Sequence, residues 1–185
     1  DLNGDGKTDL VTADRDASDV RSLLQKTYSA PTDIALTGNR VAENRPSGTV
    51  VGSLWATDAD AGDAFTYALV AGAADNSLFR IAGSQLLTNA SLNYEAKKLY
   101  TVLVQATDQH GLSYARSLAV NVTDVNERPT SVSLSSRNVV ERKPAGTVVG
   151  TLSATDPDAR QTFTYSLLGA GGRLLTPDNA AFKIR

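Results

Sequence analysis

The chain repeats itself at a spacing of 98 residues, and this repeat constrains the fold more than any other feature of the sequence. Glu43 falls opposite Glu141 (141 minus 43 is 98), and most positions of 43–67 are identical to their partners in 141–165. Similarity at one fixed spacing indicates duplication of a whole domain. The second copy ends at Arg185 without an equivalent of the later part of the first. We therefore expect a tandem repeat that is complete once and truncated once.

Alternating apolar residues predict β-strands in the complete repeat. In 100–108 the residues Tyr100, Val102 and Val104 form one alternating set, which turns one face of a strand inward. Short strands between Gly, Asp and Asn turns, in a unit of about 100 residues, are typical of an antiparallel sandwich. The predicted fold class is all-β: an antiparallel, immunoglobulin-like Greek-key β-sandwich. The predicted domains are a partial loop and hairpin at 1–28, a complete sandwich at 29–128 and a truncated second sandwich at 129–185.

Composition excludes several functional classes. Lys plus Arg total 18 against 20 for Asp plus Glu, and no basic stripe suggests nucleic-acid binding. The chain has no cysteine, which excludes disulfides, thiolate zinc sites and cysteine nucleophiles. No apolar stretch approaches the roughly 20 residues that a membrane helix needs. The absence of a signal-peptide pattern and of an initiating Met favours an internal piece of a larger protein.

Acidic and amide residues gather where the predicted strands end. They lie in the stretches VAENRP, ATDADAGD, LNYEAK, QATDQHG and TDVNERP. Hard oxygen donors without a histidine cluster favour Ca²⁺ over zinc or copper. Because Ca²⁺ takes six to eight oxygen ligands, several loops must converge to bind it. Any single Asp or Glu among them is equally explained as a turn residue.

The ordered motifs resemble those of a cadherin repeat, in its bacterial form. The resemblance covers about 31–185 and is carried by VAENRPSGTVVGSLWATDADAGDAFTYAL, LNYEAKKLYTVLVQATD and VTDVNERP. It implies an extracellular or cell-surface adhesion and spacer module that binds calcium and is not an enzyme. The implied partners are neighbouring repeats of the same chain, and another cell-surface protein or a polysaccharide.

The resemblance also implies a ligand set at the junction between the two repeats, where the ion would stiffen a flexible joint. Asn93 replaces an Asp of the family motif, and Glu127-Arg128 stands where the family has Asp-Asn. The expected inter-repeat Ca²⁺ ligands are Glu43, Asn93, Glu95, Asn126, Glu127, Asp156 and Asp158.

A second set of expected Ca²⁺ ligands lies at the opposite end of the complete repeat, toward the segment that precedes it in the chain. By the same resemblance it consists of Asp58, Asp60 and Asp108. The linker in front of it reads QKTYSAP, where the family carries an acidic linker. A site shared with an upstream module is therefore less well supported by the sequence than the junction site.

The first residues, DLNGDGKTDL, follow the start of an EF-hand type Ca²⁺ loop. Thr12 stands where the loop would need Glu, which argues against a helix-loop-helix hand. The run to Gln25 resembles the end of an FG-GAP propeller-blade repeat, so a strand is preferred over a helix for Val20 to Leu24; a solvated acidic tail is the alternative. The expected ligands are Asp1, Asn3, Asp5, Asp9 and the Lys7 backbone carbonyl.

Two single residues suggest other functions. Alternation directs Leu54 and Ala56 inward and Trp55 outward, which indicates packing along the sheet face more than a ligand platform. His110, the one histidine, has no Ser or Cys nucleophile motif beside it. The competing function that stays open is a carbohydrate-binding or accessory module of a secreted polysaccharide-active enzyme.

Overall fold

The computed structural model describes residues 10–13, 20–23, 27–168 and 181–184. The chain divides into two compact units, Asp1–Asp124 and Val125–Arg185. Among the described residues, no helix has the length and apolar character needed to cross a membrane.

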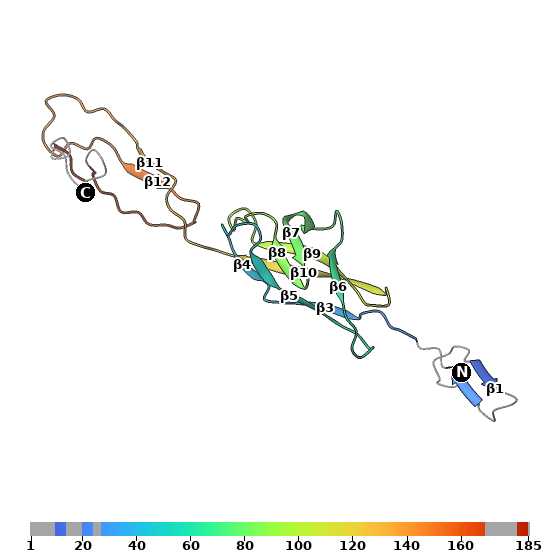
Figure 1. The fold of residues 1–185 in the computed structure, drawn as a ribbon. Coiled ribbons are helices and arrows are strands. Elements are labelled where there is room, and N and C mark those ends of the chain that lie inside the picture. Colours follow the sequence, from blue (N-terminus) through green and yellow to red (C-terminus); the bar gives the residue numbers. More distant parts are fainter. Residues whose placement is uncertain (1–9, 14–19, 24–26, 169–180, 185) are drawn as a thin grey trace. The chain divides into compact units, whose positions relative to one another are not determined.

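The first unit contains two four-stranded sheets (Figure 1). One has the order β3 (Asp33–Thr37), β5 (Val50–Thr57), β8 (Gln85–Thr88) and β7 (Phe79–Ala82). The other has the order β4 (Arg40–Ala42), β10 (Ser113–Thr123), β9 (Leu99–Thr107) and β6 (Thr66–Leu69). All neighbours pair antiparallel except β10 with β4, which pair in parallel. The predicted all-β sandwich is confirmed.

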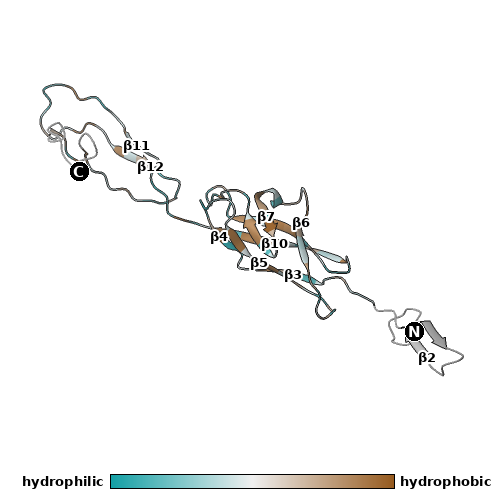
Figure 2. Cartoon of the chain, viewed as in Figure 1, coloured by the Kyte–Doolittle hydropathy of each residue, from teal (hydrophilic) through white to brown (hydrophobic). Residues whose placement is uncertain are grey.

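The core lies between the two sheets and follows the predicted alternation. Val102, Val104 and Ala106 on β9 are fully buried, and they pack with Ile34 and Leu86 from the opposite sheet. Figure 2 shows the hydrophobic residues concentrated on these strands. Burial of branched apolar side chains on both inner faces is the main term that stabilises a sandwich.

Strand β5 follows the predicted alternation and requires a glycine at one position. Leu54 is 4% exposed and Trp55 is 48% exposed, so the alternation predicted for this strand is correct. A β-bulge lies between Val50 and Gly52. A Cβ at Gly52 would lie 1.9 Å from the Thr37 carbonyl oxygen, so a larger residue would force the backbone apart.

A polar clamp ties the 3₁₀ turn η1 (Asn76–Leu78) to β9. The buried Asn76 donates to the carbonyls of Val70 and Leu103, at 2.6 and 3.0 Å, and accepts from the Leu103 N–H at 2.9 Å. Asp75 accepts from Lys97 Nζ at 2.6 Å and from the Thr101 N–H at 2.8 Å. These contacts, led by the one to Lys97, lower the pKa of the Asp75 carboxyl.

The second unit repeats one pairing of the first. Strands β11 (Ser131–Leu134) and β12 (Leu152–Thr155) pair antiparallel, with Ser131 opposite Thr155. In the first unit Asp33 lies opposite Thr57, which is the same register shifted by 98. The two copies of the 98-residue repeat therefore share the register of this strand pair as well as their sequence.

A separate hairpin precedes the sandwich in the chain. Strands β1 (Leu10–Ala13) and β2 (Val20–Leu23) pair antiparallel, with Leu10 opposite Leu23. The preference for a strand over a helix in this segment is correct.

Candidate metal centre

Carboxylates gather in two places within the first unit. The Asp58 cluster consists of Asp58, Asp63 and Asp108, and one carboxylate oxygen from each lies within 4.8 Å of the others. The Glu43 cluster consists of Glu43, Glu95 and Asp124, in which an oxygen of Glu95 lies within 4.8 Å of oxygens of both other residues.

The Asp58 cluster is assembled by two loops that follow strands of different sheets. Asp58 directly follows β5, and Asp63 lies in the same loop before β6. Asp108 directly follows β9, which pairs with β6, so the two loops come together at one place. Asp108 is 6% exposed, and the side chain of Asp63 is 4% exposed. The side chains of Asp63 and Asp108 are therefore buried where the two loops meet.

Each carboxylate of this cluster uses its Oδ1 atom in the protein. Asp108 Oδ1 accepts from the backbone N–H groups of His110 and Leu112, at 2.8 and 2.9 Å. Asp63 Oδ1 accepts from Gln109 Nε2 at 2.8 Å, and Asp58 Oδ1 accepts from the Asp60 N–H at 3.0 Å. These bonds fix the orientation of all three carboxylates.

The other oxygen of each carboxylate has no hydrogen-bond partner within the described part of the chain. These atoms are the buried Oδ2 oxygens of Asp58, Asp63 and Asp108. A buried polar oxygen without a partner is destabilising, and three adjacent anions repel one another. A divalent cation removes both penalties, and an all-oxygen donor set suits Ca²⁺ or Mg²⁺. The residues fit a calcium ion.

Two findings differ from the sequence-based expectation in detail. The structure brings Asp58 and Asp108 together, but Asp60 Oδ2 accepts from the Ser29 N–H at 2.6 Å and Asp60 is not in the cluster. Asp63 takes the third place. The signal for Asp63 was present in the acidic run ATDADAGD, but sequence alone did not show that this residue turns toward Asp108.

The Glu43 cluster contains two of the residues expected to bind at the junction. Glu43 is 1% exposed, and its Oε2 accepts from the Tyr94 N–H at 2.8 Å. Asn93 Oδ1 accepts from the Ala96 N–H at 2.6 Å, which forms the turn that carries Glu95. The Asn93 oxygen is thus used within its own turn, and Asp124 is an additional acid at this place.

The second unit brings its own expected ligands together. Asp158 is 7% exposed; its N–H donates to Asp156 Oδ1 at 3.0 Å, and its Oδ2 accepts from the Glu127 N–H at 2.5 Å. Asn126 Oδ1 accepts from Gln161 Nε2 at 3.1 Å. The four ligands expected from this unit, Asn126, Glu127, Asp156 and Asp158, therefore lie in or against the loop that follows β12. The N-terminal loop residues Asp1, Asn3, Asp5, Lys7 and Asp9 lie outside the described residues.

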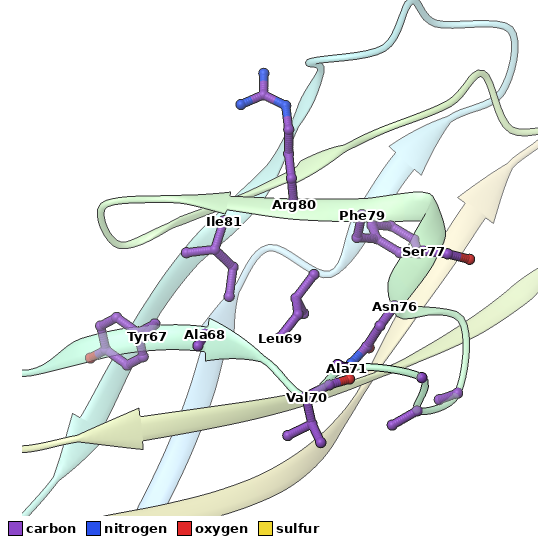
Figure 3. Close-up of a pocket in the computed structure, with 13 residues that line it drawn as sticks. Tyr67, Ala68, Leu69, Val70, Ala71, Asn76, Ser77, Phe79, Arg80 and Ile81 are labelled. Atoms are coloured by element: carbon purple, nitrogen blue, oxygen red, sulfur yellow. The ribbon is translucent and has the colours of Figure 1, made fainter.

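An open pocket between β6 and β7 carries no such chemistry. Figure 3 shows Tyr67, Leu69 and Ile81 lining it, with Arg80 on the other side of β7 from Ile81. No Asp, Glu or His lines the pocket. Partial burial raises the pKa of Tyr67, so its hydroxyl stays protonated at neutral pH. The pocket offers neither a metal site nor an acid-base pair.

Comparison with known proteins decides the family. Residues 39–123 match the family description "Cadherin domain". Human Protocadherin-16 is 38% identical over 154 residues, which cover 74% of this chain and 5% of that protein. Residues 39–123 form a cadherin domain. The Drosophila melanogaster protocadherin-like wing polarity protein stan is 36% identical over 137 residues, covering 69% of this chain and 4% of that protein.

Solved cadherin structures share the fold. Human Protocadherin-24 EC1-2 superposes with a TM-score of 0.56 at 25% identity, covering 70% of this chain and 60% of that one. A Protocadherin gammaB7 EC3-6 cis-dimer structure gives 0.52 at 30% identity, covering 71% and 32%. The chain spans only about 5% of the length of the Protocadherin-16 sequences.

Family membership supports part of the functional expectation. A cadherin domain is an extracellular adhesion domain of cell-surface proteins, and this is compatible with a module that is not an enzyme. The alternative of a carbohydrate-binding accessory module is not favoured. Protocadherin-16 and the wing polarity protein are animal proteins, so the bacterial form and the FG-GAP blade remain predictions.

Proposed function

We propose that this cadherin segment is a calcium-binding adhesion and spacer module, in which Ca²⁺ stiffens the joints of a chain of repeats. One observation carries the proposal: Asp58, Asp63 and Asp108 each bury a carboxylate oxygen that has no partner among the described residues. A bound Ca²⁺ would supply the missing partner and would offset the repulsion among the three acids.

The junction between the repeats is proposed as the second calcium site. Support comes from two sets of expected ligands, each assembled within its own unit. The set in the first unit is Glu43, Asn93 and Glu95. The set in the second unit is Asn126, Glu127, Asp156 and Asp158. Without an ion, crowded carboxylates at a joint repel each other and favour flexing. An ion bound by both sets would restrict flexing at the joint, since its ligands would come from both repeats.

Finer parts of the proposal rest on sequence alone. The loop with Asp1, Asn3, Asp5, Lys7 and Asp9 is proposed as a further calcium loop at the end of an FG-GAP type blade. The parent protein is proposed to be a secreted or surface protein of bacterial type. Its partners would be neighbouring repeats and another cell-surface protein or a polysaccharide.

Calorimetric titration of the whole chain with calcium chloride tests the first site. We expect Kd in the range of about 10⁻⁴ to 10⁻³ M, typical of extracellular modules. Asp108→Asn should remove one binding event, because it takes a carboxylate from the buried cluster. Asp75→Asn is the matched control, since Asp75 pairs with Lys97 and lies outside the cluster. A wild-type chain without calcium heat, or an unchanged Asp108→Asn titration, would contradict the proposal.

The same titration tests the junction separately. The double change Asp156→Ala/Asp158→Ala should remove a different binding event and leave the one lost in Asp108→Asn in place. Identical titrations before and after the double change would remove the support for the junction site.

A further inference from the structure

Among the four edge strands of the sandwich, β6 is the one without a charge. The edges are β3 and β7 in one sheet and β4 and β6 in the other. Strand β3 contains Asp33, β7 contains Arg80 and β4 contains Arg40, whereas β6 reads TYAL. The run 64–74 around it has no charged residue and no proline. Proteins usually protect an edge strand with a charge, a proline or a bulge, because an open edge invites pairing with another chain.

The backbone of β6 offers hydrogen-bonding groups on its open side. It pairs with β9 in an antiparallel register without a shift, and the following residue, Val70, donates its N–H to the Leu103 carbonyl at 3.0 Å. Because bonded and non-bonded residue pairs alternate along such a ladder, the N–H and C=O groups of Tyr67 and Leu69 point away from β9. On that side the sheet has no further strand within the described part of the chain.

An apolar pocket of about 530 Å³ lies beside this edge, between β6 and β7. Tyr67 and Leu69 line it from β6, and Figure 3 shows Ile81 pointing from β7 into the space between the two strands. All three side chains are only partly buried, while Ala68 on the outer face is exposed. A chain that paired with β6 would therefore cover apolar surface in addition to binding the main-chain groups.

We propose that the β6 edge pairs with the β6 edge of a second copy of this chain, antiparallel about a two-fold axis. In a two-fold contact the same strand stands on both sides, so any charge on it is opposed by its own copy. Strand β6 avoids this repulsion, and the other three edges of the sandwich do not. The inference goes beyond the calcium function, because no residue of β6 belongs to a carboxylate cluster.

One register satisfies the open backbone groups of both copies. Tyr67 of one copy lies opposite Leu69 of the other, and each such pair exchanges two main-chain hydrogen bonds. Ala68 then lies on the two-fold axis, opposite Ala68 of the second copy, with Cβ atoms about 5 Å apart. The small side chain at this position allows the strands to approach. Because a single strand pair buries less area than a standard interface, the dimer is weak.

Sedimentation equilibrium of the whole chain in EDTA measures this association, since EDTA prevents a metal ion from linking two molecules. We expect a monomer–dimer Kd on the order of 10⁻⁴ M. Ala68→Lys and Ala68→Glu should each weaken it by at least about tenfold, because each places like charges together on the axis. An equimolar mixture of the two variants should associate within about threefold of the wild-type Kd, because opposite charges then face each other.

Ala115→Lys is the matched control. Ala68 and Ala115 are both exposed and both lie opposite Gln105, so they share one face of the sheet, but Ala115 is on β10. This change should leave the Kd within about twofold of the wild-type value. A loss as large as that of Ala68→Lys would assign the association to the face of the sheet and would overturn the role of the β6 edge.

Hydrogen exchange of backbone amides locates the pairing. The Ala68 N–H bonds to β9 and should be protected at every concentration, whereas the N–H groups of Tyr67 and Leu69 are open in the monomer. Their exchange should slow as the wild-type concentration rises, and should stay fast in Ala68→Lys. The inference is overturned if the wild type stays monomeric, if the mixture of Ala68→Lys and Ala68→Glu does not associate, or if association leaves these two amides unprotected.

Discussion

The sequence GTVVG occurs in both repeats, at 48–52 and at 146–150, and has a different structure in each. In the first repeat Val51 lies in β5 and is 5% exposed. In the second, Val148 lies outside the strands and is 79% exposed. Strand β5 is paired on both sides, by β3 and β8, whereas β12, among the described residues of the second unit, pairs only with β11. Local sequence can set the register of a strand pair, but burial requires the strands that come later.

The largest difference in the free energy of unfolding is expected between substitutions of a core leucine, Leu54, and of its equivalent in the second repeat, Leu152. Leu54 is 4% exposed in β5, and Leu152 is only partly buried in β12. Leu54→Ala should lower the free energy of unfolding by about 2–4 kcal/mol, through lost burial and the cavity left behind. Leu152→Ala should change the same transition by less than about 0.5 kcal/mol. Urea unfolding followed by Trp55 fluorescence reports the first unit; equal losses in both variants would contradict the comparison.

A smaller effect is expected at Gly52 of the first repeat and at its equivalent in the second repeat, Gly150. At each of these positions the backbone lies close to a neighbouring segment. An added Cβ at Gly52 would lie 1.9 Å from the Thr37 carbonyl oxygen, and one at Gly150 would lie 2.8 Å from the Ser136 nitrogen. Gly52→Ala should therefore lower the free energy of unfolding by about 1–3 kcal/mol. Gly150→Ala should not move the transition monitored by Trp55. A stable Gly52→Ala variant would show that β3 and β5 can separate without loss of packing.

The smallest effect concerns the clamp that only the first unit shows among the described residues. Asp75→Asn removes the ion pair with Lys97 and should lower the free energy of unfolding by about 1 kcal/mol at neutral pH. Because the folded state lowers the pKa of Asp75, its contribution is present above the ordinary Asp pKa of about 4 and is lost as pH falls through the lowered value.

Urea midpoints of wild type and Asp75→Asn, measured from about pH 7 down to about pH 2.5, check this dependence. The gap between them should stay constant down to about pH 5 and close below about pH 4. A gap that persists at the lowest pH would assign the effect to packing and not to the charge.

The sequence predicted the parts of this molecule that depend on short-range patterns. Alternation placed Val102 and Val104 inside and Trp55 outside, and the structure agrees. The family motifs grouped Asp58 with Asp108, which are far apart in the chain, and the structure places both in one cluster. The place of Asp63 could not be predicted, because it depends on how the loop before β6 lies against the turn after β9. The Ser29 contact of Asp60 was missed for a related reason: its partner is a backbone N–H, which every residue except proline offers.

That last contact has a consequence for how such chains can change. Since a main-chain N–H docks the linker, the side chain at position 29 or 127 has no part in that hydrogen bond. A carboxylate can be gained or lost there by a single codon change while the docking is preserved. The charge beside the linker can thus differ between repeats, as it does between Ser29 and Glu127, with the β-sandwich left as it is.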